Sequence, residues 1–207
     1  LWQIDAQTGE VVHQHQVPKG TNGEWEYDWG YIANIGDSIL GTSVKKGSAF
    51  KSFWGGSSDG WYDAKSGKAT AKVCSEQIFS LKKSDGTQRW RYRGGLILNS
   101  TITATDKSIY FVESRHPTIL ASAERRVTDA ALWQQNFLVA VDLVTGRKVW
   151  EQPLKTTPGT VVFYMAHGNG TLALVSSSSK NYAVYAFQDK DGQSVWQLTR
   201  PSQCLKS

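Results

Sequence analysis

One thirteen-residue pattern occurs four times along the chain. Each copy has a stretch of alternating apolar residues, a polar turn that ends in glycine, and a second stretch with an aromatic residue four positions after that glycine. Glycine supplies the positive φ that a tight turn needs, and alternation with a period of two buries one face of both strands. The pattern therefore predicts four β-hairpins in a common register. They lie at 1–13, 78–90, 138–150 and 184–196, with turn glycines at Gly9, Gly86, Gly146 and Gly192.

A second strand–turn–strand pattern precedes each of the last three hairpins, at 35–43, 105–114 and 168–177. Two hairpins together make four antiparallel strands, which is the content of a β-propeller blade. The sequence therefore predicts an all-β fold, a single partial β-propeller of about three and a half blades over residues 1–207. Its parts are a half blade at 1–18, a blade at 27–93 with an insert at 45–76, a blade at 96–154 with a helical insert at 115–136, and a blade at 160–200.

The third copy carries a specific resemblance. Residues 140–150 read Ala-Val-Asp-Leu-Val-Thr-Gly-Arg-Lys-Val-Trp and resemble the tryptophan-docking repeat of quinoprotein alcohol-dehydrogenase-like (PQQ-type) propellers. The other copies match in part, and the first has His13 in place of the tryptophan. The resemblance implies structural docking between blades, not catalysis, for the following residues: Gly86, Trp90, Asp142, Gly146, Trp150, Gly192 and Trp196.

The same resemblance implies that the propeller has further blades and that the protein has a particular cellular location. Propellers of this family close with seven or eight blades, so the remaining blades would come from the parent chain or from another chain. Family members include enzymes and non-enzymatic outer-membrane assembly lipoproteins, which implies a periplasmic or cell-envelope location. The chain starts at Leu1 and contains no targeting signal, so we expect that sequence upstream of it is absent here.

Composition excludes several classes of function. The net charge is only +5 and 20% of the residues are charged, and no recognisable nucleic-acid module accompanies the excess of positive charge. No apolar run approaches the ~18 residues of a transmembrane helix. The glycines follow no nucleotide-binding pattern. Cys74 and Cys204 have no metal or redox spacing, and they could form a disulfide or remain as thiols.

The first insert, 45–76, is rich in lysine, glycine, serine and aromatic residues. Its candidate ligand residues are Trp54, Trp61, Tyr62 and Asp63. Lysine beside exposed aromatic rings can contact a protein, an anionic polymer or a carbohydrate. The alternative is a solvated loop whose aromatic rings pack on the blade.

The second insert, 115–136, has apolar residues at 120, 123, 127 and 130/131, a spacing that predicts a short helix on the propeller face. Four nearby cationic or titratable residues are candidates for an anionic ligand, and ordinary salt bridging is the alternative. They are Arg115, His116, Arg125 and Arg126. Both inserts follow the second strand of a blade, so we expect them at the same end of the propeller.

An enzymatic role would require, by resemblance, pyrroloquinoline quinone (PQQ), calcium and a carboxylate cluster. The chain has no adjacent cysteines and no evident carboxylate cluster, so no catalytic, cofactor-binding or metal-binding residue is assigned. His13 and His15 lie two apart on one strand but lack a third ligand. We therefore expect a non-catalytic binding or assembly scaffold. The alternatives are a fragment of a PQQ-dependent dehydrogenase whose cofactor site lies elsewhere, and a carbohydrate-binding module.

Overall fold

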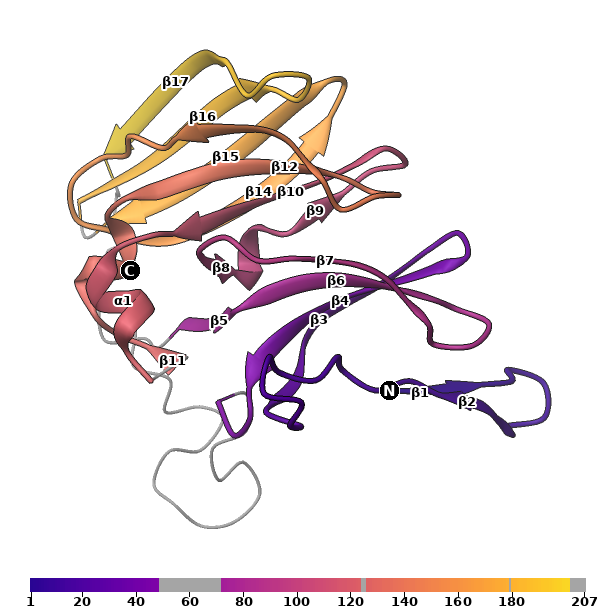
Figure 1. The fold of residues 1–207 in the computed structure, drawn as a ribbon. Coiled ribbons are helices and arrows are strands. Elements are labelled where there is room, and N and C mark those ends of the chain that lie inside the picture. The colour runs from indigo at the N-terminus through magenta and orange to yellow at the C-terminus, as the bar shows by residue number, and fades with distance from the viewer. Residues whose placement is uncertain (49–71, 124–125, 179, 202–207) are drawn as a thin grey trace, which may run out of the picture.

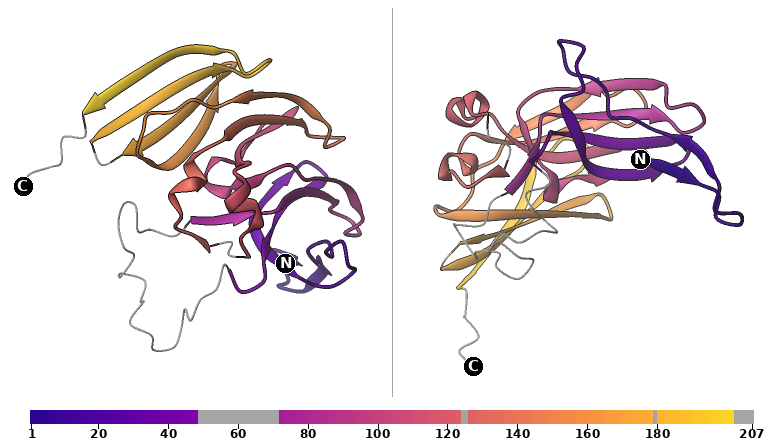
Figure 2. Two further views of the ribbon diagram at one scale, coloured as in Figure 1. Left: turned by 60° about the vertical axis from the view of Figure 1, so that its left-hand side comes forward. Right: turned by 90° about the horizontal axis from the view of Figure 1, so that it is seen from below.

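The computed structural model describes residues 1–48, 72–123, 126–178 and 180–201. Four antiparallel sheets follow one another in chain order and stack face to face (Figures 1 and 2). The predicted all-β, partial-propeller fold is confirmed. None of the described helices is long and apolar enough to cross a membrane.

The N-terminal part contains a two-stranded sheet and a four-stranded sheet. The short hairpin pairs β1 (Trp2–Ile4) with β2 (Val11–Gln14). The next sheet has the order β3-β4-β6-β7, formed by β3 (Tyr27–Ile35), β4 (Ser38–Lys45), β6 (Gln77–Lys82) and β7 (Gln88–Tyr92).

The third sheet is larger than a simple blade. It has the order β11-β5-β8-β10-β12-β13, and β9 also pairs with β10. Its strands are β5 (Lys72–Ser75), β8 (Leu96–Leu98), β9 (Thr103–Ala104), β10 (Ser108–Ser114), β11 (Arg126–Val127), β12 (Asn136–Asp142) and β13 (Lys148–Pro153). Two 3-10 helices, η2 (Asn99–Thr101) and η3 (Ala130–Trp133), and one α-helix, α1 (Pro117–Ala121), lie in its connections.

The fourth sheet is a regular meander with the order β14-β15-β16-β17. Its strands are β14 (Thr160–Gly168), β15 (Thr171–Ser178), β16 (Asn181–Gln188) and β17 (Ser194–Pro201). The alternating pattern of the sequence places one face of these strands against the third sheet, where Phe163, Leu172 and Tyr185 join a shared core with Leu138.

Local chemistry explains the repeated hairpin turns. The turn glycines Gly9, Gly86, Gly146 and Gly192 all have φ between 67° and 74°, where glycine carries no steric penalty. In the third sheet, Oδ1 of Asp142 accepts hydrogen bonds from the backbone N–H groups of Val144 at 3.1 Å and Thr145 at 2.7 Å. An aspartate that binds the backbone in this way stabilises a turn directly.

The second insert differs from the predicted helical stripe. The helix α1 is five residues long, and Val127 lies in β11, where it pairs with Lys72 of β5. The buried residues are Ile119, Val127 and Leu132, whereas Leu120 is exposed. A short helix is therefore present in the second insert, but the apolar positions 120, 123, 127 and 130/131 do not form one helical stripe, because Val127 pairs with a strand 55 positions earlier in the chain.

Candidate binding face at the inserted loops

The inserted-loop face is the end of the sheets formed by β5, α1, β11, η3 and the connection 154–159. The hairpin turns at Gly86, Gly146 and Gly192 lie at the opposite end, as Figure 1 shows. Antiparallel pairing requires this arrangement, because the connection from the second to the third strand of a blade and the connection to the next blade leave from the same edge. The inserted-loop face thus gathers the segments that depart from the repeat.

The two inserts meet in the structure. β5 comes directly before β6 but pairs with β8 of the third sheet, through Cys74 with Leu98 and Ser75 with Ile97. On its other side β5 pairs with β11 of the second insert. The Ser75 side chain bonds to Thr42 Oγ1 at 2.9 Å and donates to Asn99 Oδ1 at 2.6 Å. The second and third sheets are therefore joined by main-chain and side-chain hydrogen bonds at this face.

A short capped helix fixes the position of Trp133. Asp129 is the N-cap of η3, and its Oδ1 accepts a hydrogen bond from Ala131 N at 2.8 Å, an arrangement that satisfies a helix-end donor. Leu132 is buried in the core. The ring of Trp133 meets Phe163 of β14 nearly at right angles, with centroids 5.4 Å apart, which is a favourable aromatic geometry.

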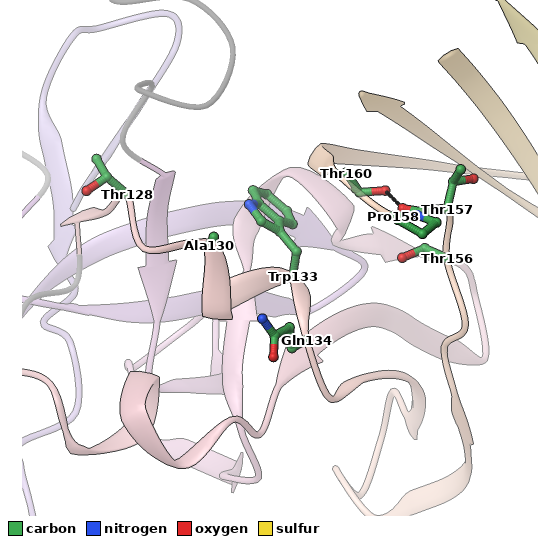
Figure 3. Close-up of a pocket in the computed structure, with 9 residues that line it drawn as sticks. Thr128, Ala130, Trp133, Gln134, Thr156, Thr157, Pro158 and Thr160 are labelled. Atoms are coloured by element: carbon green, nitrogen blue, oxygen red, sulfur yellow. Dashed lines mark hydrogen bonds between the residues drawn. The ribbon is translucent and has the colours of Figure 1, made fainter. Parts of the chain in front are cut away.

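A cavity of about 370 Å³ opens between η3 and the connection from β13 to β14 (Figure 3). Trp133 lies between Thr128 on one side and the threonines of the connection on the other. The described residues that line the cavity are all uncharged: Thr128, Ala130, Trp133, Gln134, Thr156, Thr157, Pro158, Gly159 and Thr160.

Arg115 lies at the same end but is engaged in ion pairs. Its Nε donates to Oε1 of the fully buried Glu113 at 2.7 Å, and its guanidinium contacts both carboxylate oxygens of Glu151, at 3.3 and 2.5 Å. Arg115 and Lys148 lower the pKa of Glu151 to about 2. The guanidinium carbon of Arg115 also lies 4.1 Å from the centre of the Phe137 ring. These contacts occupy the donors that an anionic ligand would need.

The other candidate residues are placed as follows. His116 precedes α1 as its N-cap residue, and its Nδ1 is buried without a hydrogen-bond partner. The backbone of Arg126 lies in β11. Trp54, Trp61, Tyr62, Asp63 and Arg125 lie outside the described residues, as does Cys204. Cys74 is buried in the core, with Sγ 3.6 Å from the carbonyl oxygen of Lys72.

Two of the candidate docking tryptophans lie at interfaces between sheets. Nε1 of Trp90 donates to the carbonyl oxygen of Leu143, and Nε1 of Trp150 donates to that of Asp189, both at 2.9 Å. Their rings lie against Gly146 and Gly192 of the following sheets. Trp196 occupies the same position in the fourth sheet and is 50% exposed.

Histidines take the place of tryptophan on the first hairpin. His13 and His15 have ring centroids 4.4 Å apart. Both rings lie against Gly86 of the next sheet. If Gly86 carried a Cβ atom, that atom would lie 3.1 Å from Nε2 of His13 and 3.2 Å from Nδ1 of His15. His15 Nδ1 is buried without a hydrogen-bond partner, and Nε2 lies 3.1 Å from Gln3 Oε1. Burial and the neighbouring His13 lower the pKa of His15.

A calcium ion in a PQQ site would need several oxygen ligands converging on one point. Among the described residues, no three Asp, Glu, His or Cys side chains are grouped in a way that could hold a metal. The buried carboxylate of Glu113 is bonded instead to Arg115 and to the hydroxyl of Tyr92, at 3.2 Å from Oε1. The donor set of the described residues does not fit such a site.

The C-terminal part of the chain is similar in sequence to a known protein family. Residues 118–207 match the family model described as outer membrane protein assembly factor BamB. The predicted resemblance to PQQ-type propeller repeats is confirmed. No curated protein sequence matches the chain.

Three solved structures are similar to this chain. Quinohemoprotein alcohol dehydrogenase from Comamonas testosteroni is 10% identical, over 88% of this chain and 23% of its own, with a TM-score of 0.49. BamB from Moraxella catarrhalis is 11% identical, over 94% and 53%, with a TM-score of 0.39. Rhamnogalacturonan lyase YesW is 13% identical, over 94% and 38%, with a TM-score of 0.50, which shows similarity of fold alone. The chain therefore spans at most about half the length of these structures.

The residues around the cavity were not singled out by the sequence pattern. Trp133 lies in the predicted insert, and Thr156-Thr-Pro-Gly forms a loop signal between two strands. That run of hydroxyl, proline and glycine residues at the inserted-loop end could have marked the site. Its approach to η3 depends on tertiary packing that no local pattern encodes.

Proposed function

We propose that the chain is part of a non-catalytic PQQ-type propeller that serves as a binding or assembly scaffold through its inserted-loop face. The observation that carries this proposal is the pairing of β5 with both β8 and β11. This pairing makes segments from two inserts into one connected surface. Insertions outside a repeat are where repeat proteins usually carry their binding sites.

The partner in this proposal is a protein of outer-membrane assembly, and the location is the periplasm or cell envelope. The description of the family whose model matches residues 118–207 supports both. The hairpin end offers less to a partner, because its turns are short and their polar groups already bond one another, as in the three bonds that Oδ1 of Asp142 accepts.

Further blades, from the parent chain or another chain, complete the ring in this proposal. Val175 and Leu198 on the outer face of the fourth sheet are 37% and 41% exposed. Val175 and Leu198 flank Val184 in one row, and the equivalent row of the third sheet is Val112, Leu138 and Gln152. Val112 and Leu138 of that row are fully buried in the core shared with the fourth sheet. Because each sheet buries its outer face under the next, the exposed apolar row supports another sheet at this position.

Site-specific photocrosslinking of the full-length parent protein tests the scaffold role. A benzoylphenylalanine at Gln134, which is exposed on the inserted-loop face, should give a discrete crosslink to a protein of the assembly machinery in cells. The matched control is the same residue at Val144, 70% exposed at the hairpin end, which should not. Equal crosslinking from both positions, or none from Gln134, would contradict the proposal.

The dehydrogenase alternative is tested separately. Full-length protein supplied with PQQ and calcium should show no dye-linked oxidation of alcohols or sugars above a no-enzyme control. Turnover that depends on both additions would contradict a non-catalytic role.

A further inference from the structure

We propose that the cavity between η3 and the β13–β14 connection is a binding site for a neutral saccharide ring. This inference deepens the proposed function by naming a ligand class for the inserted-loop face, and it rests on that face being a binding surface. It places carbohydrate recognition at Trp133, Gln134 and Thr156, in a different part of the face from the tryptophans of the first insert.

The charge of the lining selects against anionic ligands. Among the residues that the structure describes, no Lys, Arg, His, Asp or Glu lines this cavity, although the chain as a whole carries a net charge of +5. Phosphate and carboxylate groups are recognised by Arg, Lys or backbone donors at helix ends. The cavity therefore fits a ligand that presents hydroxyl groups without charge.

The lining combines an apolar platform with hydroxyl groups. The indole of Trp133 and the ring of Pro158 supply apolar surface, and the threonines lie to either side (Figure 3). A sugar ring has the matching character, because its C–H face packs on an aromatic ring while its hydroxyl groups point outward. Threonine hydroxyls both donate and accept hydrogen bonds, so they can pair with either role of a sugar hydroxyl.

Several polar groups of the cavity are available to such a ligand. Thr157 is committed, since its N–H and hydroxyl both bond to the hydroxyl of Tyr185, at 2.9 and 2.8 Å. The hydroxyl of Thr160 donates to the carbonyl oxygen of Thr157 at 2.8 Å. By contrast, the side chains of Thr156 and Gln134 make no hydrogen bond within the described part of the chain.

The committed bonds hold the site in shape. Tyr185 of β16 is buried and anchors Thr157 through these hydrogen bonds. The helix η3 is fixed by its Asp129 cap and by Leu132 in the core. A preformed site loses little conformational entropy when a ligand binds. The volume of about 370 Å³ lies at the lower end of the range for small-molecule sites, about 300–1,000 Å³, which suits a short saccharide.

A peptide is the main competing ligand class. Extended peptides are bound through main-chain hydrogen bonds to an exposed strand edge. The available groups of this cavity are side-chain hydroxyl and amide groups on a loop and a 3-10 helix. This chemistry favours a ligand that carries many hydroxyl groups over one that carries a regular backbone.

The test uses the full-length parent protein labelled with ¹⁵N at the tryptophan indoles. The Trp133 signal is assigned by Trp133→Phe. Cellotriose, maltotriose and N,N′,N″-triacetylchitotriose serve as neutral probes, trigalacturonic acid as the anionic probe, and a Gly-Ser hexapeptide as the peptide probe. Thr156→Val removes a hydroxyl from the lining, and Thr118→Val on exposed α1, outside the cavity, is the matched control.

We expect at least one neutral trisaccharide to shift the Trp133 indole signal in a saturable way. Thr156→Val should weaken that binding about tenfold, corresponding to the loss of one ligand hydrogen bond, and Thr118→Val should leave it unchanged. The native spectrum of each variant shows that it is folded.

Three results would overturn the inference. The first is that no neutral trisaccharide at millimolar concentration shifts the Trp133 indole signal. The second is that trigalacturonic acid shifts this signal more than any neutral trisaccharide does, and the third is that only the peptide shifts it. Failure here leaves the crosslink at Gln134 intact, so it would reject the ligand class without rejecting the scaffold role. Loss of that crosslink with saccharide binding retained would reject the scaffold role instead.

Discussion

The indole of Trp150 lies directly against the turn glycine Gly192 of the following sheet, so that a Cβ added to Gly192 would be 2.5 Å from Cζ3 of the ring. The same indole donates through Nε1 to the carbonyl oxygen of Asp189 in that turn. One residue pair thus ties the edge strand of one sheet to a hairpin turn of the next. The pair Trp90 and Gly146 repeats the arrangement one sheet earlier.

Replacing Gly192 by alanine should destabilise the protein more than the same change at Gly9. Both glycines have nearly the same φ, 71° and 74°, but only Gly192 faces an indole, since nothing lies within 4 Å of a Cβ at Gly9. Positive φ costs an alanine about 1 kcal/mol at either site. The steric conflict with Trp150 adds about 1–3 kcal/mol at Gly192 alone. Equal losses in urea unfolding would show that the indole does not dock on the turn.

Trp150→Phe should lower the free energy of unfolding by about 1–3 kcal/mol, because it removes a hydrogen bond and part of the buried ring. Trp196→Phe is the matched control. In the 207-residue chain Trp196 holds the same position but is 50% exposed, so its replacement there should change the free energy of unfolding by less than about 0.5 kcal/mol. A larger effect at Trp196 than at Trp150 would contradict the docking role.

The buried carboxylate of Glu113 should contribute more than an exposed ion pair. Glu113→Gln weakens the bond to Arg115 and leaves the guanidinium only partly neutralised, so we expect a loss of about 1–3 kcal/mol. Asp37→Asn, which breaks the exposed pair with Arg89, should lower the free energy of unfolding by less than Glu113→Gln does, because solvent screens an exposed pair. Thermal unfolding of both variants at neutral pH measures the difference, and a larger loss at Asp37 would be inconsistent with these contacts.

Acidification should destabilise the chain through His15. The pKa of His15 is lowered in the folded state, so the unfolded chain takes up a proton first as the pH falls. The free energy of unfolding should therefore decrease as pH drops below the usual histidine pKa of about 6.5. Urea unfolding between pH 7.5 and 5 measures this change. His15→Gln should make the curve flatter in that interval, and an unchanged curve would assign the pH dependence to other groups.

Local chemistry made much of the fold predictable. Turn glycines such as Gly146 and the alternation around them indicated hairpins, because both features act within a few residues. A short helix forms in the second insert as predicted, but the helical stripe does not extend to Val127, because apolar spacing alone does not reveal that β11 pairs with a distant strand. The cavity at Trp133 and Thr156 was not predicted for the same reason, since two segments about 20 residues apart meet only in the folded chain.

The role of the inserted-loop face is tested most directly by hydrogen–deuterium exchange of the full-length protein, alone and with the partner identified by crosslinking. We predict slower exchange on binding in peptides that cover β11 to η3 and residues 154–160, with no change at the turns of Gly146 and Gly192. Protection of those turns with unchanged exchange at the inserted loops would contradict the proposed scaffold role.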